Sequence, residues 1–159
     1  MQQPFIHVKN ISYTYPGIEG EVEAIRDVSF QVYNGEFLAI VGPSGCGKST
    51  LLSIIARLLE PSGGTISFQN PDGSLHYPRI GYMLQHDYLF EWRSIYRNVI
   101  LGPEIRKNFT PDTKEHIDRL LKDYGLYPFR DKKPSELSGG MRQRAALIRT
   151  LAINPELLL

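Results

Sequence analysis

The residues best suited to chemistry lie in one glycine-rich stretch, which runs Gly42, Pro43, Ser44, Gly45, Cys46, Gly47, Lys48, Ser49, Thr50. The spacing of Gly42, Gly47, Lys48 and Ser49 matches the complete phosphate-loop pattern. Glycines allow successive backbone N–H groups to surround phosphate oxygens closely. Lys48 would bridge the β- and γ-phosphates, and the Ser49 hydroxyl would ligate Mg²⁺. The stretch therefore predicts a nucleoside triphosphate site.

The flanking elements must position this loop. Phe37 to Val41 are apolar without alternation, which is typical of a strand buried on both faces. An amphipathic pattern over 51–59 predicts a helix directly after the loop. This strand–loop–helix context disfavours a chance glycine turn. Cys46 is read as a small residue that fills the loop, the alternative being a thiol whose pKa is lowered by nearby cations.

A second glycine motif, Leu137-Ser138-Gly139-Gly140-Met141, opens another predicted helix that runs to about 151. A serine hydroxyl, free N–H groups and the positive helix end again suit an anion. Two such helix starts on one chain are expected if ATP is sandwiched between two copies of the protein.

With both motifs in this order, the chain resembles the nucleotide-binding subunits of ATP-binding cassette (ABC) transporters over essentially its whole length. The resemblance makes residues 137–141 the signature motif, with Met141 in place of the usual Gln. It implies an α/β P-loop NTPase core with an N-terminal antiparallel β subdomain and a helical subdomain, incomplete at the C-terminus.

The resemblance also sets the expected organisation of residues 1–159 as a single, partial ABC ATPase domain. Residues 1–86 would form the ATP-binding core with the β subdomain, 87–151 the helical subdomain, and 152–159 the start of the Walker B strand. Local patterns predict further strands at 5–15, 28–33, 65–68 and 80–84, a loop at 87–98, and a helix from Thr110 to Gly125.

Two further site residues follow from the resemblance. Tyr15 would stack on adenine, the alternative being a tyrosine packed in the core of a strand. Gln85 follows a predicted strand and resembles the Q-loop glutamine, which would contact Mg²⁺ and the attacking water and sense the transporter. Gln85 and Lys48 are therefore the candidate catalytic residues, Ser49 and Gln85 the candidate metal ligands, and ATP and Mg²⁺ the expected cofactors.

The pair Trp92-Arg93 follows this glutamine closely, and in this respect the segment resembles the ATP-binding subunits of importers of nitrate, sulfonate, taurine and related anions. In that reading Phe90 and Trp92 help to form a groove for a membrane permease subunit, although Phe90 could equally pack in the core. The expected partners are permease subunits at the Gln85–Arg93 region and a second copy of the chain.

Hydrolysis in this family requires an Asp and then a Glu after an apolar strand. Residues 153–159 resemble the approach to that strand, and the acidic pair does not follow within the 159 residues. Glu156 precedes the strand and lies at its wrong end. We therefore expect these residues to bind ATP without useful turnover, and to expose apolar surface that leaves the chain marginally stable or self-associating.

Composition and apolar runs limit the possible partners and the location of the chain. Eighteen basic and 17 acidic residues give a net charge of +1, so no nucleic-acid partner is expected. Without a signal-like or membrane-length apolar run, the expected location is cytoplasmic. The resemblance implies that the chain is peripheral on the inner face of the cell membrane. Two alternatives stay open: a soluble ABC ATPase of DNA repair or translation, and a natural non-catalytic nucleotide-binding fragment.

Overall fold

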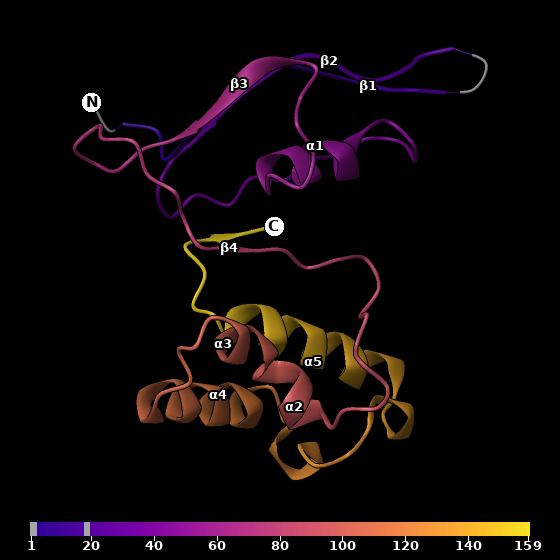
Figure 1. Ribbon diagram of the computed structural model, residues 1–159, viewed down its shortest axis with the longest axis vertical. Helices are drawn as coiled ribbons and strands as arrows, with labels where there is room; N and C mark the ends of the chain where they lie inside the picture. Colours follow the sequence, from indigo (N-terminus) through magenta and orange to yellow (C-terminus); the bar gives the residue numbers. More distant parts are fainter. Residues whose placement is uncertain (1–2, 18–19) are drawn as a thin grey trace. The chain divides into compact units, whose positions relative to one another are not determined.

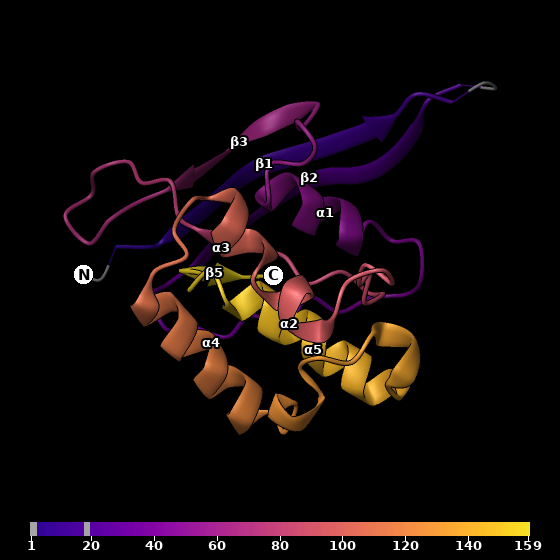
Figure 2. The same cartoon turned by 60° about the horizontal axis from the view of Figure 1, so that its bottom comes forward.

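The computed structural model describes residues 3–17 and 20–159, and the chain divides into two compact units, Met1–Pro78 and Arg79–Leu159. Figures 1 and 2 together label their α-helices and strands. Each unit is described by itself. No helix in the described part of the chain is long and apolar enough to cross a membrane.

The described residues of the first unit form an antiparallel sheet and one helix. Strands β1 (Ile6–Tyr15), β2 (Val22–Val32) and β3 (Gly63–Phe68) pair in the order β2-β1-β3. Helix α1 (Lys48–Ile55) lies beside the sheet in Figures 1 and 2. The buried residues of this unit come from both the sheet and the helix: Ile6, Val8, Ile11, Ile25, Val32, Leu51, Ile54, Ile55, Phe68. Burial of these apolar side chains holds α1 against the sheet.

The prediction of a buried strand at Phe37 to Val41 is wrong. The segment has no regular structure, and Phe37 and Val41 are 94% and 88% exposed. An apolar run shows where burial is favoured, but it forms a strand only where neighbouring strands bind its backbone. In the described sheet of the first unit, β2, β1 and β3 pair with one another and leave this segment unpaired.

The second unit is mainly helical. It contains α2 (Ile95–Val99), α3 (Leu101–Ile105), α4 (Pro111–Asp123), the 3₁₀ turns η1 (Tyr127–Phe129) and η2 (Pro134–Glu136), and α5 (Gly139–Leu151). The predicted starts of the two long helices are confirmed. Thr110 and Ser138 accept hydrogen bonds from the backbone N–H groups of Thr113 and Met141, three residues further on.

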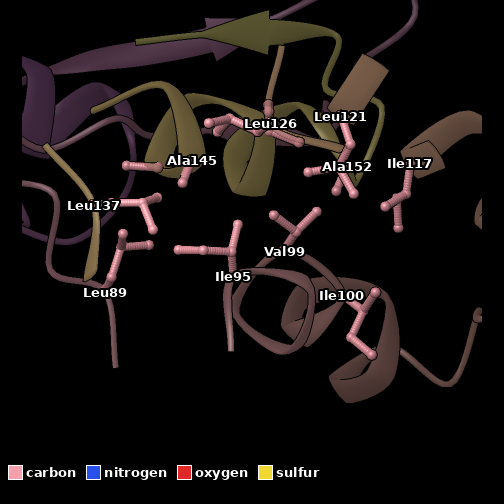
Figure 3. Packing of buried hydrophobic residues seen from close by; sticks show 12 residues of the cluster. Leu89, Ile95, Val99, Ile100, Ile117, Leu121, Leu126, Leu137, Ala145 and Ala152 are labelled. Carbon is pink, nitrogen blue, oxygen red and sulfur yellow. The ribbon is translucent and has the colours of Figure 1, made fainter. Parts of the chain in front are cut away.

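A single apolar cluster joins α2, α4 and α5, and Figure 3 shows its side chains close together between these helices. Its buried members are Leu89, Ile95, Val99, Ile100, Ile117, Leu121, Leu126, Leu137, Ala145, Ala146, Ile148, Ala152. Leu89 lies just before the helices, and Leu137 is the first residue of the second glycine motif. The cluster therefore anchors both segments that carry candidate site residues of this unit.

The structure changes two further expectations in this unit. Strand β4 is only Ile80–Gly81, paired in parallel with β5 (Leu157–Leu158), although Met83 N–H still donates to the Leu159 carbonyl at 2.8 Å. The loop predicted at 87–98 ends early, because α2 begins at Ile95 with Ser94 as its N-cap. A helix of five residues is too short to display a helical period clearly.

Candidate functional site

The glycines of the phosphate loop hold a backbone that side chains would prevent. Gly45 and Gly47 have φ angles of 81° and 90°, in the left-handed region. A Cβ on Gly47 would lie 2.4 Å from the Ala24 carbonyl oxygen of β2, and one on Gly42 would lie 2.7 Å from Cys46 Sγ. Gly47 thus lets the start of α1 approach β2, while the space at Gly45 is open.

Lys48 closes the loop on itself. Its Nζ donates to the carbonyl oxygens of Gly42 at 2.9 Å and Pro43 at 2.6 Å, and lies 3.5 Å from Cys46 Sγ. The ammonium group is therefore held against the backbone of the phosphate loop, whose residues are largely exposed. Ser49 is exposed beside it. A cation and a hydroxyl next to open loop backbone are the groups that a triphosphate with Mg²⁺ requires.

The start of α1 adds to this anion site. Gly47, its N-cap, has no side chain to accept a hydrogen bond from the first turn. By contrast, Thr110 and Ser138 cap α4 and α5. The first-turn N–H groups of α1 can therefore donate to phosphate oxygens at the positive end of the helix. The residues present fit ATP with Mg²⁺ on these grounds.

Tyr15 lies at the end of β1, and its side chain is 40% exposed. Its hydroxyl lies 3.1 Å from Thr50 Oγ1 in α1, and its ring meets that of Tyr13 edge-on at 4.8 Å. These contacts fix the ring relative to the phosphate loop and leave part of its surface open. Thr50 itself is buried, so its hydroxyl serves this tether.

The second glycine motif presents an exposed helix start. Ser138, Gly139 and Gly140 are all exposed, and a Cβ on Gly140 would meet no atom within 4 Å. Ser138 Oγ accepts from Met141 N–H at 3.3 Å, which leaves its own hydroxyl proton free to donate. Met141 is half-buried and packs against the apolar cluster, which accounts for an apolar residue at that position.

Gln85 is exposed, and its backbone carbonyl accepts from Gln143 Nε2 of α5 at 3.4 Å. The residues that follow it are held by two arginines that sequence reasoning missed. Arg142 Nε donates to Asp87 Oδ2 at 3.1 Å, and Arg149 donates to the carbonyl oxygens of Asp87 at 2.7 Å and Tyr88 at 2.8 Å. Burial lowers the pKa of Arg149, and the charge of Asp87 opposes this shift.

A sequence signal for these arginines does exist. Arg142 and Arg149 are seven residues apart, so they lie two turns apart on one face of α5. Asp87 is the acidic residue nearest after Gln85. That pattern alone does not identify which segment the helix face contacts.

The aromatic residues further along this segment differ in exposure. Trp92 is 73% exposed, whereas Phe90 is half-buried; their ring centroids are 4.9 Å apart. Arg93 Nη1 is directed back into the unit and donates to the Arg97 carbonyl at 3.2 Å. The indole of Trp92 is therefore exposed at the surface, while the neighbouring Arg93 side chain is bonded to the backbone of the unit.

The predicted site residues are thus divided between the units. Tyr15 and residues 42–50 belong to the first unit, and Gln85 and residues 138–140 belong to the second. A glycine loop with Lys48 over its carbonyls, before an uncapped helix that packs on a sheet, defines a P-loop nucleotide-binding protein.

The family model described as ABC transporter matches residues 25–159, and the chain belongs to that family. Over 155 residues it is 50% identical to the uncharacterized ABC transporter ATP-binding protein YtlC of Bacillus subtilis (strain 168), covering 98% of this chain and 60% of the relative. It is 41% identical to the taurine import ATP-binding protein TauB of Jannaschia sp. (strain CCS1), covering 96% and 57%. The sulfate/thiosulfate import ATP-binding protein CysA of Synechocystis sp. (strain ATCC 27184 / PCC 6803 / Kazusa) is 40% identical, covering 97% and 43%.

Solved structures agree with this fold. The ADP- and Pi-bound dimer of the ATP-binding cassette MJ0796, in a post-hydrolysis state, superposes with a TM-score of 0.81 at 30% identity, covering 96% of this chain and 72% of that one. CbiO1 from Clostridium perfringens, part of the complex cbiONQ, gives 0.78 at 29% identity, covering 99% and 64%. The chain spans about 60% of the length of YtlC and 57% of TauB.

Proposed function

We propose that the chain is part of the ATP-binding subunit of an ABC importer, and that the whole subunit couples ATP binding and hydrolysis to uptake of a small anion of the nitrate, sulfonate or taurine kind. The observation that carries nucleotide binding is the phosphate loop, where Lys48 Nζ lies over the carbonyls of Gly42 and Pro43 beside the uncapped start of α1. The printed names of the relatives, which import taurine and sulfate or thiosulfate, support the substrate class.

Each candidate residue has a role in this proposal. Tyr15 stacks on adenine, residues 42–50 bind the phosphates, and Ser49 and Gln85 ligate Mg²⁺. Residues 138–140 of a second copy bind the γ-phosphate, which makes the functional unit a homodimer. The dimeric state of the ADP-bound cassette MJ0796 supports this arrangement.

The segment from Gln85 to Arg93 is the proposed contact with the permease subunits. The exposed ring of Trp92 supports this role, since aromatic side chains are favoured anchors at interfaces. A subunit with this partner is cytoplasmic and peripheral on the inner face of the membrane, and it needs no nucleic acid. The division at residue 86 into an ATP-binding core and a helical subdomain stays part of the proposal.

For residues 1–159 tested as they are, we propose nucleotide binding without steady-state turnover. The resemblance expects the catalytic Asp and Glu after the strand to which β5 corresponds. Glu156 lies before β5, and its Oε2 accepts from Arg79 N–H at 2.8 Å, so it is engaged elsewhere. Lys48 and Gln85 alone provide charge stabilisation and orientation but no water-polarising carboxylate.

Calorimetric titration with ATP and Mg²⁺ tests the nucleotide site. We expect saturable binding by the wild-type chain, a loss of at least about tenfold in affinity in Lys48→Ala, since a charge-assisted contact is removed, and no loss in the matched surface variant Lys9→Ala. Equal affinity in all three chains would place nucleotide elsewhere. Release of phosphate at a steady rate by the purified 159 residues would overturn the claim of no turnover.

Transport is tested in cells. Deletion of the gene should abolish uptake of one radiolabelled anion among taurine, sulfate and nitrate, and the wild-type gene should restore it while the Lys48→Ala gene does not. Unchanged uptake of all three, together with a DNA-repair or translation defect, would favour a soluble ABC ATPase.

A further inference from the structure

One ion pair joins the two candidate site segments of the second unit. Arg142 Nε donates to Asp87 Oδ2 at 3.1 Å, and Nη1 of the same guanidinium donates to the Leu137 carbonyl at 3.2 Å. Leu137 directly precedes Ser138, and Asp87 follows Gln85 by two residues. A single side chain thus spans from the start of the signature helix to the segment that carries the glutamine.

Further side chains of α5 strengthen this attachment. Arg149 binds the carbonyls of Asp87 and Tyr88 through its two terminal nitrogens, and Gln143 binds the Gln85 carbonyl. Tyr88 has a φ angle of 42°, an uncommon conformation for a bulky residue that persists where surrounding contacts hold it. The backbone from Gln85 to Tyr88 is therefore attached to α5 at three points.

The next residue, Leu89, is buried in the apolar cluster together with Ala145 of α5. The segment is thus fixed to the helix by both polar and apolar contacts. Trp92, three residues further on, is exposed. Motion of α5 would accordingly move the exposed indole rather than be absorbed in a flexible connection.

We propose that Asp87 is a positioning residue that makes the Gln85–Trp92 segment and the signature helix move as one body. When Ser138 engages nucleotide held by a second copy, the displacement is then carried through Arg142 and Asp87 to the surface that meets the permease. The roles of Ser138 and Trp92 rest on the proposed function, whereas the mechanical link itself does not.

The partly buried environment makes the ion pair between Asp87 and Arg142 stronger than an ordinary surface ion pair. The side chains of Asp87 and Arg142 are 23% and 36% exposed, so water screens their attraction only in part. Exposed pairs contribute little, whereas charge-assisted bonds with fixed geometry are stronger. Asp87 Oδ1 also accepts from Leu89 N–H at 3.2 Å, which fixes the carboxylate for Arg142.

Hydrogen–deuterium exchange of the nucleotide-free chain tests the link. In Asp87→Asn an amide oxygen remains for Leu89 N–H, but the charge that binds Arg142 is lost. We expect exchange to accelerate about tenfold both at 85–90 and at 141–146, consistent with loss of one charge-assisted contact. Glu91→Gln removes an exposed carboxylate from the same segment and should leave both regions unchanged.

A charge reversal separates pairing from a general loss of structure. Asp87→Arg should accelerate exchange in both regions, and adding Arg142→Asp should restore at least half of the protection. Protection at 85–90 should also fall with added salt in the wild-type chain but not in Asp87→Asn, because only the wild type contains the screened pair. Acceleration confined to 85–90, or no recovery in the double variant, would overturn the proposal.

Nucleotide titration keeps this test distinct from that of the proposed function. Asp87→Asn should bind ATP with Mg²⁺ as tightly as the wild type. Altered exchange in a chain that binds no ATP would uphold the link and reject the function. Normal ATP binding with unaltered exchange would uphold the function and reject the link.

Discussion

The side chain of Asn98 pairs with the backbone of Phe90 on both of its hydrogen-bonding groups. Phe90 N–H donates to Asn98 Oδ1 at 2.7 Å, and Asn98 Nδ2 donates to the Phe90 carbonyl at 3.1 Å. The same amide reaches the carbonyls of Arg93 at 3.3 Å and Ser94 at 3.0 Å. Asn98 is fully buried, so this one side chain in α2 fixes the turn that presents Trp92.

Replacement of Asn98 by Ala should therefore be strongly destabilising. It leaves the Phe90 backbone groups without their partner and opens a small cavity, which together cost about 2–4 kcal/mol. Urea denaturation followed by circular dichroism measures this cost. Asn108→Ala, at an exposed position, should change stability by less than about 0.5 kcal/mol. Equal midpoints for the two variants would contradict the assignment.

The sequence predicted the elements whose signals are local. The Thr110 and Ser138 caps and the glycine loop each depend on neighbouring residues, and the structure shows both caps directly. Family membership followed from the order of two motifs and is shown by the match over 25–159.

The failures concern features that depend on distant partners. Phe37 to Val41 read as a buried strand because their composition is apolar, yet strand formation needs a neighbouring backbone that a composition pattern does not contain. The contacts of Arg142 and Arg149 with Asp87 span 55 and 62 residues. One sequence without a structure does not identify such pairs.

The glycines of the phosphate loop should differ in their tolerance of alanine. Gly45→Ala meets open space and pays only the cost of a positive φ angle, about 1 kcal/mol. Gly47→Ala adds a Cβ 2.4 Å from the Ala24 carbonyl, so α1 must move away from β2. We expect Gly47→Ala to lose more stability than Gly45→Ala in urea denaturation, and equal losses would argue against this packing.

The apolar cluster of the second unit should be sensitive at its centre. Leu121 of α4 is fully buried, and Leu121→Ala should cost about 2–5 kcal/mol, because it removes apolar contacts and leaves a cavity. Ile105→Ala is the control, since Ile105 is largely exposed in α3. Thermal and urea unfolding of both variants check the difference. A Leu121→Ala chain as stable as Ile105→Ala would show that the helices do not share one core.

Glu136, at the end of η2, should make stability depend on pH just before the signature motif. Its Oε2 accepts from Lys133 N–H at 2.7 Å and its Oε1 from Lys132 Nζ at 2.9 Å, and these bonds lower the pKa of the carboxyl. A carboxyl whose pKa is lower in the folded chain stabilises it above the pKa of the unfolded chain, and this contribution disappears as pH falls through the folded value. The wild-type chain should therefore exceed Glu136→Gln in stability at pH 7, and the difference should vanish in acid.

Denaturation midpoints at a series of pH values from neutral down to about 3, below the ordinary range of glutamate, measure this difference in stability. Glu60→Gln, in the first unit, serves as control, and a difference that grows in acid would give the opposite sign and refute the assignment.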